Sequence, residues 1–312
     1  MNNKATLNPV LTGLAQTFMS STSGFVGTTI APVFNSGLAS GQYYQWDRAN
    51  YLNIPDDLSR SPGTEYQTLK SSLSDDTFLC KDLGVQIPVD DSERALYASS
   101  FSADQAATER ATLTVMTNHE RQVQTMLTDA SIPTVDSNTV NFTSSAVADI
   151  KALFRAATES VRLNCGMKPN VCIMSETVLN ALMDNPNVVA QIQHTVTAGV
   201  TDASIIARVF SLPPISVASA IINSVDEGVG ETPADLWGAT VYLSVTNPSQ
   251  DLQALNFART FAWSAPGVGG ALSIKSYRDD SKSSDFFVSH AFRGQKLTAP
   301  EAGYTITEVL TS

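Results

Sequence analysis

The residue types that most often carry catalysis or bind metals are scattered along this sequence. The histidines and cysteines number three each, and they are His119, His194, His290, Cys80, Cys165 and Cys172. A structural zinc site needs ligands in paired spacings such as CxxC, and a disulfide framework needs an even number of cysteines. Neither is indicated, so the chain is expected to fold in a reducing, intracellular compartment.

His119 stands beside Glu120, which would suit a general base next to a carboxylate. No second histidine follows four residues later, as a helical metal-binding motif would require. A polar helix face is therefore the preferred interpretation of this pair. His194 and His290 are isolated, and local hydrogen bonds explain them better than catalysis.

Acidic doublets are the next candidates, because carboxylate oxygens suit hard cations such as calcium. Four occur: Asp56-Asp57, Asp75-Asp76, Asp90-Asp91 and Asp279-Asp280. Each lacks the spaced third and fourth ligands of a calcium loop, so solvated turns and helix N-termini are favoured. Asp90-Asp91-Ser92 in particular would complement the positive end of a following helix.

Sequence motifs of the common enzyme classes are absent: the chain has no GxSxG, GxxxxGK[ST] or HExxH, and no GxGxxG after a strand. The run PGVGGAL at 266–272 indicates a turn between strands rather than a phosphate-binding loop. Cys80, in TFLCKDLG, is expected to be a small buried hydrophobe. The sequence predicts no catalytic residue, no cofactor and no bound metal, and an uncharacterised α+β enzyme is kept only as an alternative.

Composition indicates a folded protein with little affinity for phosphate groups. Of the 312 residues 43% are hydrophobic and 16% charged, and the net charge is −11. Binding nucleic acid by neutralising phosphates requires clustered lysines and arginines. No signal peptide is predicted, and the longest apolar run, VFSLPPISVASAIINSV, is interrupted by Pro213 and Pro214, so no membrane span is expected.

The N-terminal third is expected to be an arm followed by a long two-stranded excursion. The arm carries a short helix, NPVLTGLAQTFM, which begins at Asn8 with Pro9 in its first turn. The excursion runs out through QYYQWDRANYL, turns at NIPDDLSRSPG and returns through EYQTLKSSLSDDTFLCKDLGVQIPV. An isolated two-stranded ribbon is marginally stable in water, so this one should lie on another surface.

A long amphipathic helix is predicted over residues 91–129. No Gly or Pro interrupts this segment, and its apolar stripe is expected to consist of Leu113, Met116, Val123, Leu127 and Ala130. The charged side chains off the stripe are Glu109, Arg110, Glu120 and Arg121.

Helices and strands then alternate from residue 144 onward. SSAVADIKALFRAATESVRLNC predicts a helix capped by Ser144 or Ser145, KPNVCIMS a buried strand, and SETVLNALMDNP a helix ended by Pro186. NVVAQIQHTV and DASIIARVF predict further helices, and PPISVASAII and TVYLSVTN strands. The last segment, from FARTFAWSA to GYTITEVL, is rich in strands and is expected to pack beside the long helix. The fold class is α+β, with a central sheet covered by helices.

The order of these pieces resembles the major capsid proteins of tailed bacteriophages with the Hong Kong 97 fold. The more specific parts are IAPVFNSGLASGQYYQWDR and KPNVCIMSETVLNALMDNPNVVAQI, and the resemblance spans essentially the whole chain. It implies an N-terminal arm (1–35), an extended loop (36–88), a peripheral domain with a spine helix (89–143), an axial domain (144–256) and return strands with a C-terminal strand (257–312).

The resemblance implies a structural role without catalysis. Subunits would assemble as hexamers and pentamers into an icosahedral shell around double-stranded DNA, with no sequence-specific binding and no membrane. The expected location is the virion, after assembly in the cytoplasm of the bacterial host. Portal and possibly cement proteins are expected partners, and a separate scaffold protein as well, because the arm starts at Met1. The alternative within the fold is an encapsulin-like shell that encloses cargo protein.

Two features of the excursion bear on assembly. Its tip has no lysine, so the covalent cross-linking known from the family's namesake is not expected. Exposed aromatic and arginine side chains dominate the energetics of many interfaces. The candidates for contact between subunits are Tyr44, Trp46, Arg48, Arg60, Glu109, Arg110, Glu120 and Arg121, although for the helix residues a merely solvated face is an equal alternative.

Overall fold

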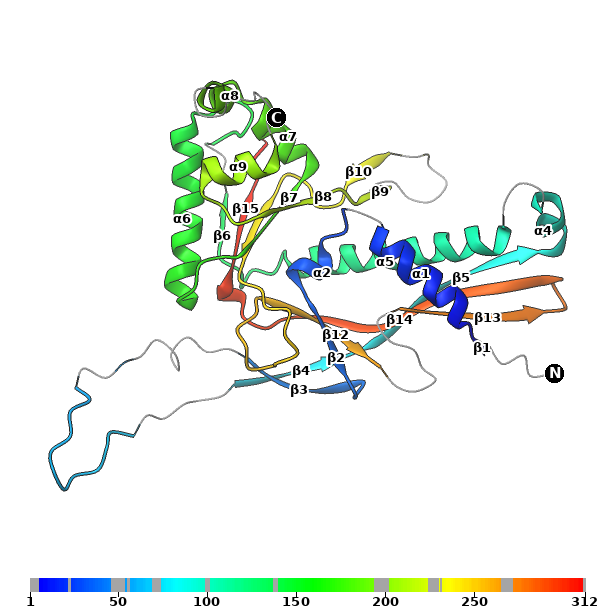
Figure 1. Ribbon diagram of the computed structural model, residues 1–312, viewed down its shortest axis with the longest axis horizontal. Helices are drawn as coiled ribbons and strands as arrows, with labels where there is room; N and C mark the ends of the chain where they lie inside the picture. The colour runs from blue at the N-terminus through cyan, green and yellow to red at the C-terminus, as the bar shows by residue number, and fades with distance from the viewer. Residues whose placement is uncertain are drawn as a thin grey trace.

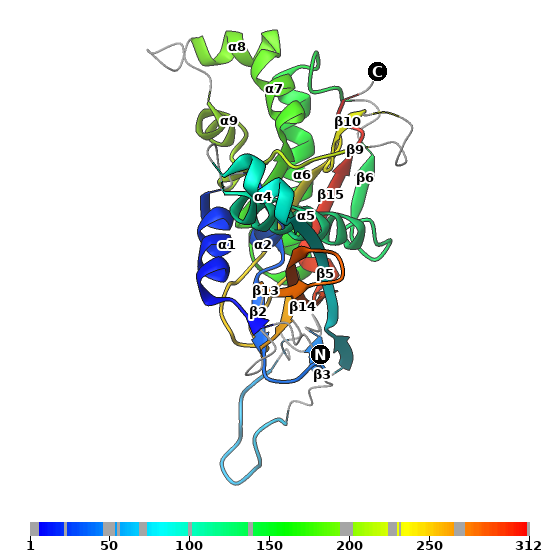
Figure 2. The same cartoon turned by 90° about the vertical axis from the view of Figure 1, so that its right-hand side faces the viewer.

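A computed structural model describes residues 6–21, 24–45, 54, 57–68, 74–98, 102–136, 140–193, 202–223, 230, 232–264 and 272–310. Two sheets organise these residues, each with helices against it (Figure 1). A long extended segment projects from the body beside the first sheet, and Figure 2 shows the same projection from the side. The observed mixture of helices and sheets is the predicted α+β class.

The first sheet has six strands. They are β1 (Thr6–Leu7), β2 (Val33–Ser36), β5 (Lys81–Asp90), β12 (Ala258–Trp263), β13 (Ser273–Asp279) and β14 (Ser284–Leu297). The strand order is β1-β13-β14-β12-β2, and β5 also pairs with β14. Every pairing is antiparallel except that of β12 with β2. Residues 81–90 therefore belong to this sheet, although the sequence pattern assigned most of them to the extended loop.

Two helices replace the single long helix predicted over 91–129. They are α4 (Asp91–Tyr97) and α5 (Ala103–Met126). Each has its own N-cap: Asp90 accepts a hydrogen bond from the Ser92 amide at 2.8 Å, and Ser102 accepts one from the Gln105 amide at 3.4 Å. The sequence showed no sign of this break, because neither Gly nor Pro lies in it. Ser102, with extended backbone, separates the two helices by capping the second one.

The buried face of α5 also differs from the predicted stripe. Its buried residues are Ala107, Thr108, Ala111, Thr112, Val115, Met116, His119, Glu120 and Val123. Leu113 is 40% exposed and Ala130 is exposed, whereas Met116, Val123 and Leu127 are buried as expected. The buried side chains of α5 thus include polar and charged groups, so hydrophobicity alone was a poor guide to this face.

The N-terminal arm lies on the first sheet. Helix α1 (Pro9–Ser21) begins as predicted, with the Asn8 Oδ1 accepting hydrogen bonds from the amides of Val10 and Leu11. Ala15 packs with Val115, Ile274 and other apolar residues in a small core. A short helix, α2 (Gly27–Ile30), then leads into β2.

The second sheet has five strands in the order β6-β15-β11-β7-β8. They are β6 (Thr134–Asp136), β7 (Val171–Ser175), β8 (Ile215–Ala218), β11 (Val241–Ser244) and β15 (Gly303–Thr307). β11 is antiparallel to β15 and β7, and the two outer pairings are parallel. The last strand of the chain therefore leaves the first sheet and completes the second.

Four helices accompany the second sheet: α6 (Val147–Cys165), α7 (Glu176–Asp184), α8 (Pro186–Gln193) and α9 (Ala203–Phe210). Ser175 caps α7, but no side chain caps α6, so the capping role predicted for Ser144 or Ser145 is wrong. Phe142, Phe154 and Phe210 form an aromatic chain in the core between helices and sheet. A short ribbon of β9 (Ile221–Asn223) and β10 (Pro233–Asp235), and a 3-10 turn η1 (Pro300–Ala302), complete this part.

Candidate assembly surfaces

The extended loop begins as a ribbon of β3 (Ser40–Gln45) and β4 (Ser74–Leu79), paired antiparallel as predicted. Alternation along β3 gives its two tyrosines opposite environments. Tyr43 is 2% exposed and Tyr44 is 52% exposed. Tyr44 is thus available to another molecule, whereas Trp46 and Arg48 lie outside the described residues and their roles stay predictions.

Stacked aromatic rings anchor the base of this ribbon to the first sheet. Phe261, on β12, lies parallel to Phe78 with ring centroids 4.2 Å apart, and it also contacts Phe34 and Tyr43. The Tyr43 hydroxyl donates to Asp76 Oδ2 at 3.0 Å. Burial, followed by this carboxylate, raises the pKa of Tyr43. The base of the ribbon is therefore part of the subunit core.

The described part of the loop tip, residues 57–68, has no regular secondary structure and is exposed throughout. Arg60 lies over the ring of Tyr66, with its guanidinium carbon 4.4 Å from the ring centroid. Leu58 is 64% exposed and Tyr66 73% exposed. Within the described chain no core covers these apolar side chains. Exposed apolar groups of this kind are typical of a protein–protein interaction surface.

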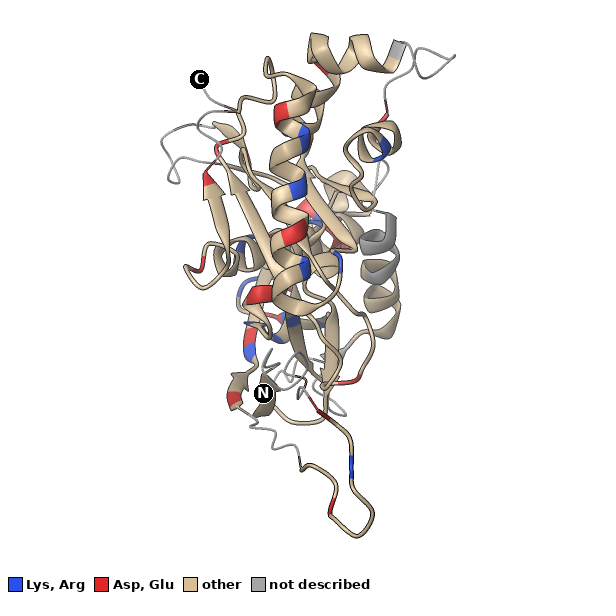
Figure 3. Ribbon diagram, turned by 90° about the vertical axis from the view of Figure 1, so that its left-hand side faces the viewer, with Lys and Arg blue, Asp and Glu red and all other residues tan. Residues whose placement is uncertain are grey.

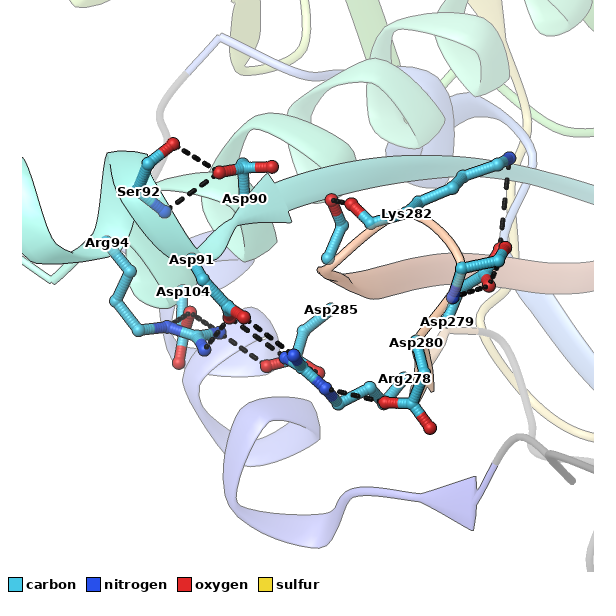
Figure 4. Close-up of polar contacts among 12 residues, drawn as sticks. Asp90, Asp91, Ser92, Arg94, Asp104, Arg278, Asp279, Asp280, Lys282 and Asp285 are labelled. Atoms are coloured by element: carbon cyan, nitrogen blue, oxygen red, sulfur yellow. Dashed lines mark hydrogen bonds and ion pairs between the residues drawn. The ribbon is translucent and has the colours of Figure 1, made fainter.

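A cluster of ion pairs joins α4 to the hairpin of β13 and β14 (Figure 4). Arg278 Nη2 lies 2.6 Å from Asp91 Oδ2, and Arg94 Nη2 lies 2.7 Å from both Asp104 and Asp285. Hydrogen bonding to Arg278 lowers the pKa of Asp91. All these groups are partly exposed, so each pair is expected to add little to the stability of the fold.

The four acidic doublets have different environments from one another. Asp75 and Asp76 lie on β4 rather than in the expected turn, and Asp76 forms an ion pair with Lys296 at 3.2 Å. Asp57 accepts a hydrogen bond from the Ser59 amide at 2.7 Å. Within the described residues no three histidine, cysteine or acidic side chains are grouped closely enough to hold a metal ion.

The candidate residues of α5 divide into two groups. Glu109 is half-buried, and Arg110 and Arg121 are exposed, so these three remain available for contacts. Arg121 borders a groove of about 600 Å³ together with Lys81 and Lys296. Glu120 is 1% exposed and points into the subunit, so its assignment to a contact face was wrong.

Glu120 belongs to a buried polar network that sequence patterns did not reveal. Its Oε1 accepts a hydrogen bond from the Gly27 amide at 2.6 Å, and its Oε2 accepts one from Trp237 Nε1 at 3.1 Å. Burial raises the pKa of Glu120. This side chain thus links three distant segments: α5, the end of the arm at α2, and the turn before β11.

His119 and Arg293 share a cavity of about 130 Å³ with Glu120. His119 Nε2 lies 3.2 Å from Thr260 Oγ1, and burial lowers the pKa of His119 to about 3. Arg293 donates from Nη2 to the Val115 carbonyl at 2.6 Å, and burial lowers its pKa to about 10. The pair His119-Glu120 is therefore not a solvated helix face.

A signal for this network does exist in the sequence. His119 and Glu120 lie three and four residues after Met116, and Val123 follows Glu120 by three, so all four share one helix face. The predicted stripe contains Met116 and Val123 from this face but leaves out His119 and Glu120, because it is drawn from apolar residues alone. Of the other two histidines, His290 is 4% exposed and lies beside Ser273. His194 lies outside the described residues.

The cysteines are buried, as expected for Cys80. Cys80 is 7% exposed, and its thiol donates weakly to the Phe261 carbonyl at 3.5 Å. Burial raises the pKa of Cys80 and of Cys165, and raises that of Cys172 to about 12. A thiol whose pKa is raised carries little reactive thiolate at neutral pH.

Comparison with solved structures shows which known proteins share this fold. No protein-family model and no curated protein sequence matches the chain. Among solved structures, a phage-related protein from Bordetella bronchiseptica has a TM-score of 0.72 at 18% identity, with 98% of each chain covered. The capsid of Myoviridae phage XM1 has a TM-score of 0.58 at 10% identity, with 92% of each covered. A virus-like particle from Pyrococcus furiosus has a TM-score of 0.56 at 11% identity, with 95% of this chain and 97% of that chain covered.

These similarities extend over nearly the whole chain, so they concern the complete architecture rather than one shared motif. The chain has the α+β fold of tailed-phage capsid proteins, of the Hong Kong 97 type, as the order of its sequence segments predicted. Among the helices that the structure describes, none has both the length and the apolar character required to cross a bilayer.

Proposed function

We propose that this protein is the major capsid protein of a tailed bacteriophage. Copies of it would form hexamers and pentamers that close into an icosahedral shell around double-stranded DNA. The observation that carries this proposal is the similarity of nearly the whole chain to phage capsid structures, such as that of phage XM1 at a TM-score of 0.58, and to a phage-related protein at a TM-score of 0.72. Its role would be structural, and its place the virion after assembly in the host cytoplasm.

The form of the subunit supports assembly. The loop tip leaves Leu58 and Tyr66 exposed, and the ribbon exposes Tyr44, as expected when burial is completed by another copy. The net charge of −11 suits a wall that encloses DNA without binding it tightly. Scaffold, portal and cement proteins would be its partners, and Tyr44, Trp46, Arg48, Arg60, Glu109, Arg110 and Arg121 its candidate contact residues.

Electron microscopy of the purified chain, alone and with the scaffold protein of its source, tests the proposal. We expect closed shells or isolated capsomers. A monomer that persists at every concentration, with the scaffold present, would contradict the assignment. The control is Phe261→Ala, which should disrupt the subunit core and so remove assembly together with folding.

A shell that encloses cargo protein is the second candidate, since a fold similar to this one also occurs in a virus-like particle from Pyrococcus furiosus. Nuclease treatment of particles isolated from infected or expressing cells distinguishes the two. Protected double-stranded DNA of uniform length supports the phage capsid. A co-purifying cargo protein, with no protected nucleic acid, supports the alternative.

A further inference from the structure

The part of the subunit built on the second sheet has two exposed edges on opposite sides. Helix α6 forms one edge, and Figure 3 looks directly onto its outer face. The β9–β10 ribbon forms the other edge, at the far side of the sheet in Figure 1. When identical copies join head to tail into a ring, each copy contacts its two neighbours through two different patches on opposite sides.

The outer face of α6 carries apolar and basic side chains that the core does not use. Its inner face already buries Ile150, Phe154 and Val161. Leu163, in the last turn, is 60% exposed, and Met167, just after the helix, is 51% exposed. The exposed charged residues on and just after the helix are Asp149, Arg155, Glu159, Arg162 and Lys168, of which Arg162 and Glu159 form an ion pair. Three basic groups against two acidic ones leave this α6 face with a small positive charge.

The opposite edge is apolar and acidic. Ile221 on β9 is 61% exposed, and Pro233 on β10 is exposed. Asp235 on β10 accepts a hydrogen bond from Thr177, next to the exposed Glu176 at the start of α7. A two-stranded ribbon of three residue pairs has little stability of its own, so contact with a further surface would stabilise it.

We propose that the outer face of α6 in one copy packs against the β9–β10 ribbon of the next copy, head to tail around a capsomer ring. Leu163 and Met167 would cover Ile221 and Pro233, while Arg155 and Lys168 would face Glu176 and Asp235. The inference rests on the proposed capsid function, since it names the surfaces by which neighbouring copies meet.

Cysteine cross-linking in assembled particles tests this arrangement. The native cysteines are all buried, so introduced thiols will dominate the reaction. A chain carrying both Leu163→Cys and Ile221→Cys is assembled, treated with a short bis-maleimide and denatured. We expect a ladder of covalent oligomers that extends to the full ring. Mixed assembly of the two single variants should stop at a covalent dimer containing one copy of each.

The single variants distinguish head-to-tail packing from a two-fold contact. Each of them alone should give no cross-linked product, because the same patch never meets itself. A dimer formed by Leu163→Cys alone would overturn the proposal. The matched control combines Leu163→Cys with Leu96→Cys on α4, a 70% exposed position away from the second sheet, and should give no ladder.

The outcomes also separate this inference from the proposed function. Shells that form normally but show no ladder in the double variant overturn the α6 interface and leave the capsid assignment intact. Absence of any oligomer of the unmodified chain, with scaffold present, overturns both.

Discussion

The Glu120 carboxylate on α5 accepts a hydrogen bond from the Trp237 indole at 3.1 Å, across 117 positions of sequence. Trp237 is 1% exposed and packs edge-on against Tyr242 on β11 of the second sheet. The same carboxylate binds the Gly27 amide at the end of the arm. One buried acidic residue thereby ties the helix on the first sheet to the arm and to the second sheet.

Gly27 should tolerate no side chain. A Cβ at this position would lie 2.6 Å from Glu120 Oε1, and Glu120 is buried and held by hydrogen bonds from Gly27 and Trp237 that a shift would break. We expect Gly27→Ala to lower the free energy of unfolding by about 1–3 kcal/mol, as overpacking does. Gly13→Ala is the matched control, because nothing lies within 4 Å of its added methyl, and it should stabilise α1 by about 0.5–1 kcal/mol. Equal effects in urea unfolding would contradict the Glu120 contact.

His119 should make the subunit sensitive to acid. Burial lowers its pKa to about 3, so the folded state excludes the proton that the unfolded chain binds below pH 6.5. Its contribution to stability is therefore complete above pH 6.5 and declines as the pH falls towards 3, by at most about 1.4 kcal/mol per pH unit. Urea unfolding between pH 7 and 4 should show a shallower pH dependence for His119→Gln than for the unmodified chain. Parallel curves would refute this role.

Glu120 should contribute with the opposite sign. Its pKa is raised by burial, so the folded state binds the proton more tightly than the unfolded chain does. The resulting stability is fully present below the unfolded value of 4.5 and is lost as the pH rises through the folded pKa. Relative to Glu120→Gln, the unmodified chain should therefore be most stable at low pH. The same titration, run on the unassembled subunit, measures this, and a growing advantage at higher pH would show that Glu120 is stabilised as an anion.

Neighbouring tyrosines on β3 should separate folding from assembly. Tyr43→Ala removes a buried ring from the cluster around Phe261 and should cost about 3–5 kcal/mol of unfolding free energy. Tyr44→Ala should leave the unfolding free energy within about 0.5 kcal/mol, because its side chain is 52% exposed, but should reduce the yield of particles. Denaturation of the subunit and particle counts by electron microscopy give the two readouts. Normal assembly of Tyr44→Ala would remove this residue from the interface.

Much of the local structure was predictable from neighbouring residues. Asn8 starts α1 and Ser175 starts α7, as the sequence indicated, and Tyr44 on β3 is exposed, as a contact candidate should be. Caps and strand alternation depend on side chains a few positions apart, so the information is local. The order of these elements was sufficient to predict the Hong Kong 97-type fold.

The tertiary structure alone decided which surfaces are internal. Glu120 is buried because its hydrogen-bond donors come from Gly27 and Trp237, 93 and 117 positions away. β5 pairs with β14, and β15 joins the second sheet, through contacts between segments that no local pattern relates. Burial of a charge depends on partners brought together by the whole fold, since an unpaired buried carboxylate is strongly unfavourable. For that reason the sequence determined most elements and their order, and the folded chain determined which side chains remain for other copies.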